Sequence, residues 1–262
     1  MQKEILVRRL IFLTIRFIVA LASSSSLAQQ DGSLFESHTF TYDNGRSMPY
    51  RLFVPRGYTA SKKYPLILWL HGSAGRGNDN VRNISGGNKL GAQIWTLTSN
   101  QSKHPCFVVV PQCPDTAYWV SNDGIDKPPD QLDVAVNLLK ELQGKFSLDT
   151  DRIYVAGQSM GGVATWEVIS RYEKVFAAAL PLCGIGNVRN APKLTRIAIW
   201  AFHGDADEIV PVAQTREMVG AIRRAGGRPK YTEYKGVGHD VWNSAFKERD
   251  LVAWLFRQAR NK

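Results

Sequence analysis

Short apolar runs that alternate with longer amphipathic segments are the feature of this chain that most restricts its fold. The runs occupy residues 66–70, 107–110, 153–156, 176–182 and 197–202, and the segment KYTEY follows at 230–234. Uninterrupted apolar runs of this length are typical of strands covered on both faces, as in parallel sheets. Helical periodicity predicts helices at 129–146, 160–172, 212–225 and 244–260. The pattern therefore predicts an α/β fold with a mostly parallel central sheet and helices on both faces.

The region before these runs has alternating residues in HTFTY (38–42) and MPYRLFVP (48–55). The connection contains Asn44 and Gly45, and an Asn-Gly pair supplies the positive φ angles of a tight turn. We expect an antiparallel hairpin at the N-terminal side of the domain.

The first residues have the layout of a secretory signal. A basic start (Lys3, Arg8, Arg9) precedes an apolar run at 10–22 and small residues that end in Ala28. We predict a signal peptide over 1–28, hence a secreted or periplasmic protein with no stable membrane span after processing. The alternative is an uncleaved membrane anchor, although the run is shorter than the roughly 20 residues of a span.

Length and charge limit the number of domains and the kinds of partner expected for the rest of the chain. A chain of 262 residues with 44% apolar content is long enough to bury one large hydrophobic core, and we expect a single domain over 29–262. The formal charge of +10 falls to +7 when the first 28 residues are removed. No nucleic-acid motif with interleaved aromatics accompanies this charge, so it favours solubility and an anionic surface or polymer over nucleic acid. Oligomeric state is left open.

The chain contains three cysteines, Cys106, Cys113 and Cys183, an odd number that cannot pair completely. Export would permit one disulfide, and we expect it between Cys113 and Cys183, which both follow strand ends on one rim of the sheet. Their spacing matches no zinc pattern, and we expect neither a metal nor an organic cofactor.

The segment GQSMG at 157–161 lies between an apolar run and a helical segment. Glycines two residues either side of Ser159 leave space for a sharp strand-to-helix turn, which can present a serine hydroxyl as a nucleophile. The amide of Met160 at the start of the helix, and that of Ser73 in the glycine-rich loop HGSAGRG, are candidate donors to an oxyanion. The alternative for either segment is a plain flexible loop.

The serine needs a base, and the chain has five histidines: His38, His71, His104, His203 and His239. His38 lies in the hairpin and His104 precedes a strand at the wrong rim. His71 and His203 each precede a glycine at a strand end, where an imidazole often shapes a loop. His239 follows the last strand in a glycine turn, and we predict that it is the base.

The acid should lie between Ser159 and His239, and HGDADEIVP offers Asp205, Asp207 and Glu208. Its function would be to fix the imidazole tautomer and stabilise the charged ring.

Residues 50–260 resemble the α/β-hydrolase superfamily, close to secreted esterases of the phospholipase/carboxylesterase, polyhydroxyalkanoate depolymerase and feruloyl esterase type. The resemblance is carried by PLILWLHGSAGRG, VVPQCP, RIYVAGQSMGGVATW, FAAALPLCG, IAIWAFHGDADEIVP and YKGVGHDVW. It implies an α/β-hydrolase fold and a serine carboxylic-ester hydrolase with Ser159, Asp207 and His239 as the triad, Asp205 being second choice for the acid.

The interval 183–196, where related enzymes often insert a cap, is only of loop length, so we expect no cap domain. Aromatic residues should then line the open cleft, and we select Trp119 first, then Trp166 and Trp242. We expect short-acyl or aromatic-acyl esters, small or borne on polymers, as substrates. The alternatives are a serine peptidase or acyltransferase with the same residues, and a non-catalytic binding protein of this fold.

Overall fold

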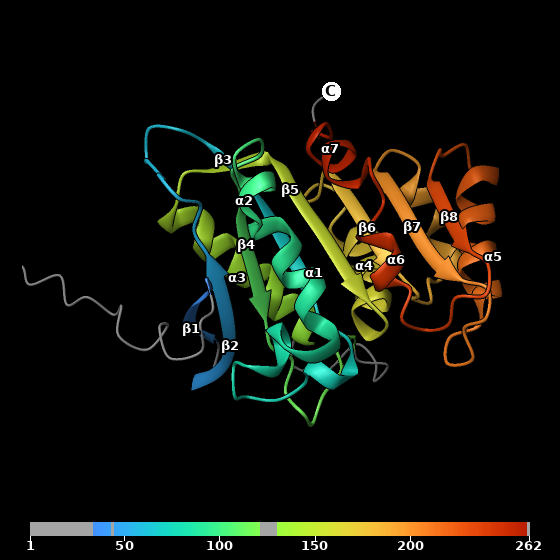
Figure 1. The fold of residues 1–262 in the computed structure, drawn as a ribbon, viewed down its shortest axis with the longest axis horizontal. Helices are drawn as coiled ribbons and strands as arrows, with labels where there is room; N and C mark the ends of the chain where they lie inside the picture. Colours follow the sequence, from blue (N-terminus) through green and yellow to red (C-terminus); the bar gives the residue numbers. More distant parts are fainter. Residues whose placement is uncertain (1–33, 43–44, 121–129, 261–262) are drawn as a thin grey trace, which may run out of the picture.

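The computed structural model describes residues 34–42, 45–120 and 130–260 (Figure 1). The predicted signal peptide at 1–28 lies outside the described residues. The described chain forms a single sheet with helices on both faces, as the sequence pattern predicts.

Eight strands form this sheet in the described chain: β1 (Glu36–Tyr42), β2 (Arg46–Phe53), β3 (Tyr64–Leu70), β4 (Phe107–Pro111), β5 (Leu148–Gln158), β6 (Ala178–Leu182), β7 (Ala198–Gly204) and β8 (Lys230–Tyr234). Their spatial order is β1-β2-β4-β3-β5-β6-β7-β8. The pairings from β4 to β8 are parallel, whereas β1 pairs antiparallel with β2, and β2 with β4. The predicted hairpin is confirmed, and Gly45 in its turn has a φ of +74°.

The α-helices are α1 (Lys89–Gln93), α2 (Thr98–Gln101), α3 (Gln131–Lys145), α4 (Met160–Arg171), α5 (Val212–Arg224), α6 (Trp242–Ala245) and α7 (Leu251–Phe256). The 3-10 helices are η2 (Ser73–Gly75), η3 (Arg82–Ile84), η4 (Gly86–Asn88), η5 (Ile94–Thr96) and η6 (Val188–Leu194). Helices α3, α4 and α5 pack on one face, and α1, α6 and α7 on the other, the near face in Figure 1.

The strands are buried on both faces because successive side chains enter opposite halves of the core. In β3, Leu66, Leu68 and Leu70 join the cluster under α3 and α4, while Ile67 and Trp69 join the cluster under α1 and α7. All five are fully buried. This two-sided burial explains why the sequence of β3 is uninterruptedly apolar.

The prediction of one helix over 244–260 is wrong. The structure has two short helices, α6 and α7, separated by residues 246–250. Phe246 in this break packs edge-on against Trp69 and Trp95, with ring centroids 5.7 and 5.9 Å away, and Glu248 accepts the Tyr234 hydroxyl at 2.7 Å. We infer that these tertiary contacts override the local helical periodicity.

The connection between β6 and β7, which is fully described, contains only η6 and loop residues. The expectation of no cap domain is therefore confirmed for this part of the chain. Within the described ranges, no helix has the length and apolar content needed to cross a membrane.

Candidate active site

Ser159 lies in the sharp turn between β5 and α4. Its φ and ψ are 54° and −118°, an unusual combination for a residue with a side chain, of a kind that costs on the order of 1–3 kcal/mol. The flanking glycines make the turn possible, because a Cβ on Gly157 would overlap the Gly161 carbonyl and one on Gly161 would overlap the Leu70 carbonyl. The sequence pattern thus predicted both the turn and the reason for its glycines.

Three of the predicted side chains converge at the carboxyl edge of the sheet. The Nε2 atom of His239 lies 2.8 Å from Oγ of Ser159, and its Nδ1 lies 2.8 Å from Oδ2 of Asp207. Asp205, the second choice for the acid, instead accepts the amide of Gly236 at 2.6 Å. The geometry brings together a hydroxyl, an imidazole and a carboxylate in one hydrogen-bonded chain.

Backbone amides hold the carboxylate of Asp207. Its Oδ1 atom accepts the N–H groups of Ile209 and Val210, each at 2.9 Å. Burial by itself raises the pKa of Asp207, but the hydrogen bonds from Val210, His239 and Ile209 outweigh burial and bring the pKa below its ordinary value. Asp207 is consequently ionised at neutral pH, as an acceptor for the His239 N–H must be.

The loop after β3 lies beside the start of α4. A Cβ on Gly72 would be 3.5 Å from the carbonyl oxygen of Gln158, so the loop backbone passes next to the residue before Ser159. Ser73 begins η2 and Met160 begins α4, where the first amides of a helix lack partners within the helix. Both predicted amide donors therefore belong to segments that border the Ser159 turn.

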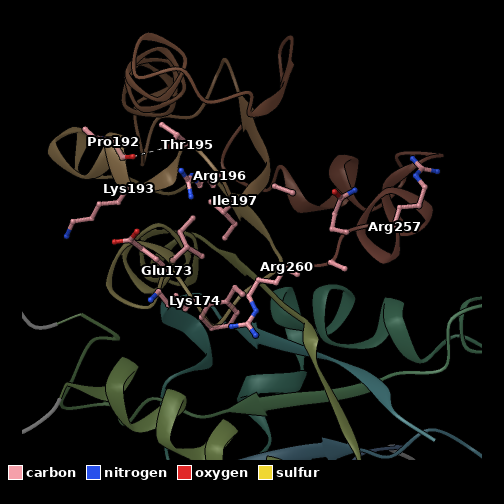
Figure 2. A pocket seen from close by; sticks show the side chains of 15 residues that line it. Glu173, Lys174, Pro192, Lys193, Thr195, Arg196, Ile197, Arg257 and Arg260 are labelled. Atoms are coloured by element: carbon pink, nitrogen blue, oxygen red, sulfur yellow. Dashed lines mark hydrogen bonds between the residues drawn. The ribbon is translucent and has the colours of Figure 1, made fainter. Parts of the chain in front are cut away.

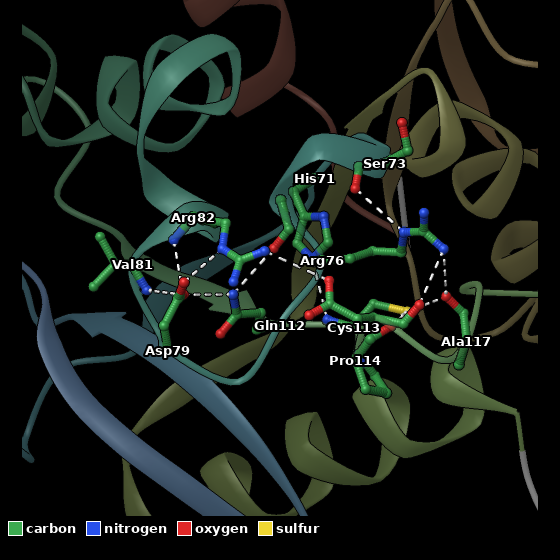
Figure 3. Close-up of polar contacts among 12 residues, drawn as sticks. His71, Ser73, Arg76, Asp79, Val81, Arg82, Gln112, Cys113, Pro114 and Ala117 are labelled. Atoms are coloured by element: carbon green, nitrogen blue, oxygen red, sulfur yellow. Dashed lines mark hydrogen bonds and ion pairs between the residues drawn. The ribbon is translucent and has the colours of Figure 1, made fainter.

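His71 fixes this loop through hydrogen bonds on both of its ring nitrogens (Figure 3). Its Nε2 accepts the amide of Cys113 at 3.0 Å, so its proton resides on Nδ1, which donates to the Gly72 carbonyl at 2.7 Å. Trp119 donates its indole N–H to the His71 carbonyl at 3.0 Å. Burial lowers the pKa of His71 to about 4, which keeps the ring neutral. The sequence-based expectation that His71 shapes a loop agrees with these contacts.

Sequence reasoning missed several amides that stabilise the same region. Asn88 accepts the Gly72 amide at 3.0 Å, and Gln158 donates to the Gly87 carbonyl at 3.1 Å. Gln112 donates to Gly75 O at 3.1 Å. A lone asparagine or glutamine has no spacing signature, so no signal in the sequence could have identified them.

Two of the three tryptophans selected as substrate-facing residues are in the core, which corrects that expectation. Trp119 is fully buried with its ring tilted against that of His71, the centroids 4.9 Å apart, and Trp166 of α4 is 2% exposed within the core cluster on that face. Trp119 lies in a polar loop, but its indole satisfies a buried carbonyl rather than facing the cleft. Trp242 is partly exposed at the start of α6, and its ring centroid lies 5.8 Å from that of His239.

The expected disulfide between Cys113 and Cys183 is absent, since all three cysteines of the chain are free and buried. Cys113 belongs to the hydrophobic cluster on one face of the sheet and Cys183 to the cluster on the other. Two cysteines that follow strand ends on the same rim need not form a disulfide, because here the two thiols point to opposite faces of the sheet.

Cys183, Asp207 and His239 are the residues of this site that could hold a metal, since their ligand atoms lie within 4.8 Å of one another. Burial raises the pKa of the Cys183 thiol and disfavours the thiolate that a metal requires. Both ring nitrogens of His239 already have hydrogen-bond partners. An ion here would replace the hydrogen bonds of the site instead of supplementing them.

A separate hollow of about 670 Å³ lies at the other end of the sheet, near the amino ends of β6 and β7 (Figure 2). Its basic lining residues are Lys174, Lys193, Arg196, Arg257 and Arg260, and Glu173 is the acidic one. None of the converging residues lines it, so cavity size does not identify the candidate active site in this protein.

The sequence model of the family described as putative esterase matches residues 42–247. The chain belongs to this family. The esterase is 26% identical over 217 residues to the probable feruloyl esterase C of Aspergillus terreus, a match that covers 76% of the esterase and 73% of that relative. It is 32% identical over 78 residues to the bifunctional acetylxylan esterase/xylanase XynS20E of Neocallimastix patriciarum, covering 29% of the esterase and 12% of that protein.

Among solved structures, the esterase resembles a thermostable esterase with a TM-score of 0.82 and 35% identity. That match covers 87% of the esterase but 64% of the other chain, slightly less than two thirds of its length. The feruloyl esterase module of Clostridium thermocellum, complexed with sinapinate, has a TM-score of 0.64 at 17% identity, with 86% and 88% of the two chains covered. The chain thus has the α/β-hydrolase fold that these solved esterases share.

Proposed function

We propose that this esterase cleaves carboxylic esters through an acyl-enzyme formed on Ser159, with His239 as the base and Asp207 as the acid. The hydrogen-bond chain from Oγ of Ser159 through the His239 ring to Asp207 carries the proposal, since each distance along it is 2.8 Å. The strained backbone of Ser159 supports it further, because strain of this kind persists where function requires a fixed geometry.

In the first half-reaction, Oγ of Ser159 attacks the ester carbonyl carbon while Nε2 of His239 takes the hydroxyl proton. The carbonyl oxygen becomes an oxyanion, for which the amides of Met160 and Ser73 are the proposed donors. The bond from carbon to the leaving oxygen then breaks, and the His239 imidazolium donates its proton to that oxygen. The alcohol leaves and the acyl group remains on Ser159.

The second half-reaction repeats these steps with water. His239 takes a proton from the water as its oxygen attacks the acyl carbon, and the tetrahedral adduct collapses with return of the proton to Oγ of Ser159. The products are a carboxylic acid and the free enzyme. Asp207 stabilises the imidazolium in both halves, and its depressed pKa keeps it ionised for that purpose.

We infer that the substrates are short-acyl or aromatic-acyl esters displayed on large molecules. The connection from β6 to β7 carries no cap, and Trp242 lies beside His239 with its ring partly exposed. Ile209, next to the turn that holds Asp207, is 71% exposed and offers a second apolar surface. The similarity to the probable feruloyl esterase C of Aspergillus terreus supports the same class of ester.

Hydrolysis of p-nitrophenyl esters of increasing acyl length, and of methyl ferulate, tests the proposal. Ser159→Ala should reduce kcat/KM by roughly 10³-fold or more while the protein stays folded. Ser73→Ala is the matched control, because the proposed donor is the backbone amide and the side chain can be removed with activity retained. Turnover in Ser159→Ala equal to that of wild type would refute the assignment of Ser159 as the nucleophile. Peptide cleavage without ester turnover would instead favour the peptidase alternative.

We further propose that the protein is exported and that its mature form begins after Ala28. The similarity to an uncharacterized secreted protein of Arthroderma benhamiae, 24% identical over 233 residues and matched over 23% of its length, supports export. Expression of the full chain in a bacterial host, followed by mass spectrometry of the protein outside the cytoplasm, tests this. An uncleaved N-terminus in the membrane fraction would favour the anchor.

A further inference from the structure

A second histidine contacts the carboxylate of Asp207. His203 lies near the end of β7 and is fully buried. Its Nε2 atom is 3.2 Å from Oδ2 of Asp207, the same oxygen that Nδ1 of His239 contacts at 2.8 Å. Oδ2 of the proposed triad acid is therefore shared by two imidazoles.

The surroundings of His203 fix its tautomer. Its Nε2 faces two acceptors, the ionised Asp207 and the carbonyl of Val210 at 2.9 Å, so Nε2 carries the proton. Its Nδ1 lies 2.7 Å from the buried hydroxyl of Thr215, whose one hydrogen has two acceptors, Nδ1 of His203 and the more distant Gly184 carbonyl at 3.3 Å. With the proton of His203 on Nε2, the hydroxyl donates to Nδ1. A neutral His203 protonated on Nε2 therefore leaves neither ring nitrogen without a partner.

We propose that His203 is a positioning residue for ester hydrolysis. Its Nε2–H is hydrogen-bonded to the Val210 carbonyl, and the same polar edge of the ring lies 3.2 Å from Oδ2 of Asp207, where it attracts the carboxylate and keeps Oδ2 in place to accept the His239 N–H. This inference rests on the proposed function, because it matters only if His239 is the base. The amides of Ile209 and Val210 fix Oδ1, and the two histidines fix Oδ2. Both oxygens of the carboxylate are then in contact with polar N–H groups, which opposes rotation of its plane away from His239.

The contact should also affect catalysis by His239. The partial positive charge on the Nε2–H edge of His203 offsets part of the charge on Oδ2, so the imidazolium that forms on His239 during turnover is stabilised less than by a carboxylate without this neighbour. Loss of the contact should therefore move the acid limb of the pH–rate profile to higher pH. A purely structural role for His203 would change stability and leave this limb in place.

Other titratable groups nearby are unchanged in the test. Glu233 of β8 is opposite His203 in the strand register and is ion-paired with Arg216 of α5 at 2.6 Å. Other titratable groups on the adjoining segments are Cys183 after β6, Asp205 and Glu208 after β7, and Tyr234, Lys235, His239 and Asp240 at or after the end of β8. Each of these groups is retained in the variants below, so a shift of the acid limb of the pH–rate profile reports on the contact between His203 and Asp207.

Two substitutions separate the contact from packing. His203→Asn places its amide near the position of Nδ1 and leaves Oδ2 without the donor, whereas His203→Gln can place an N–H near Nε2. We expect kcat of His203→Asn on p-nitrophenyl acetate to fall about tenfold with KM nearly unchanged, as for other residues that orient a catalytic group. Its acid limb should move to higher pH, and His203→Gln should retain both the rate and the limb.

Thr215→Val is the matched control, because it disturbs the same buried cluster on the Nδ1 side and keeps the donor on Asp207. It should lower the melting temperature without moving the limb. A limb of His203→Asn that coincides with that of wild type would overturn the proposal. Turnover retained in Ser159→Ala would overturn the proposed function instead, so the two failures are distinguishable.

A measurement on the wild-type protein avoids dependence on the folding of the variants. The ¹⁵N NMR shifts of the His203 ring at neutral pH should show a neutral ring protonated on Nε2. A ring protonated on Nδ1 alone would place no hydrogen between His203 and Asp207 and would refute the assignment.

Discussion

Replacement of His71 by glutamine should remove much of the loss of stability that this esterase suffers between pH 7 and pH 5. His71 is fully buried, and its Nε2 accepts a hydrogen bond from the Cys113 amide. A proton on Nε2 would therefore face the amide N–H and break this hydrogen bond. Burial accordingly lowers the pKa of His71 to about 4. The folded state excludes a proton that the unfolded chain binds at a pKa near 6.5.

The size of the effect follows from these two pKa values. Between them the unfolded state binds more protons, so the free energy of unfolding decreases as the pH falls from 6.5 towards 4. Each pH unit in this window is worth about 1.4 kcal/mol, so acidification from pH 7 to pH 5 should cost about 2 kcal/mol. The depressed pKa values of Asp79, Asp207 and Glu233 act in the same direction, but mainly below pH 4.

Urea denaturation followed by tryptophan fluorescence at pH 7 and pH 5 measures the effect. The wild type should lose about 2 kcal/mol of stability, and His71→Gln should lose clearly less, although it starts from a lower value. His104→Gln is the matched control. Desolvation also lowers the pKa of His104, but its ring is only partly buried, so most of the wild-type loss should remain. An equal loss in His71→Gln and wild type would refute the reasoning.

Three further outcomes are expected. Gly161→Ala should abolish activity and lower the melting temperature because its Cβ would overlap the Leu70 carbonyl, whereas Gly144→Ala, with open space around it, should stabilise α3 by roughly 0.5–1 kcal/mol. Asp207→Asn should stay folded and lose kcat by about 10⁴-fold, and Asp205→Asn should remain active, as activity assays on both would show. Trp242→Ala should raise KM for aromatic esters more than for p-nitrophenyl acetate, and equal changes would argue against a substrate contact.

The parts of this protein that could be predicted from sequence are those with a local signature. The glycines around Ser159 occur at a spacing that favours a tight turn. The apolar run at 197–202 and the segment KYTEY marked the strands that precede Asp207 and His239. The position after a strand was enough to bring these side chains to one edge, because parallel strands end at the same edge.

The sequence-based predictions were wrong where the result depends on which face of the sheet a side chain packs against. Trp119 and Trp166 were selected as exposed aromatics, yet both are buried, since a polar neighbourhood in sequence does not report tertiary packing. Cys113 and Cys183 were expected to pair, but they enter opposite halves of the core. The contact of His203 with Asp207 depends on the rotamer of a buried ring, and no spacing in the sequence encodes it.

The three free thiols have a consequence for how this esterase acquires its shape. No disulfide between distant parts of the chain has to form, so the native state requires neither an oxidant nor a disulfide isomerase. The domain should fold to the same structure in a reducing cytoplasm as in an oxidising compartment. Reducing agents should leave its melting temperature unaltered, because no disulfide contributes to the stability of the native state.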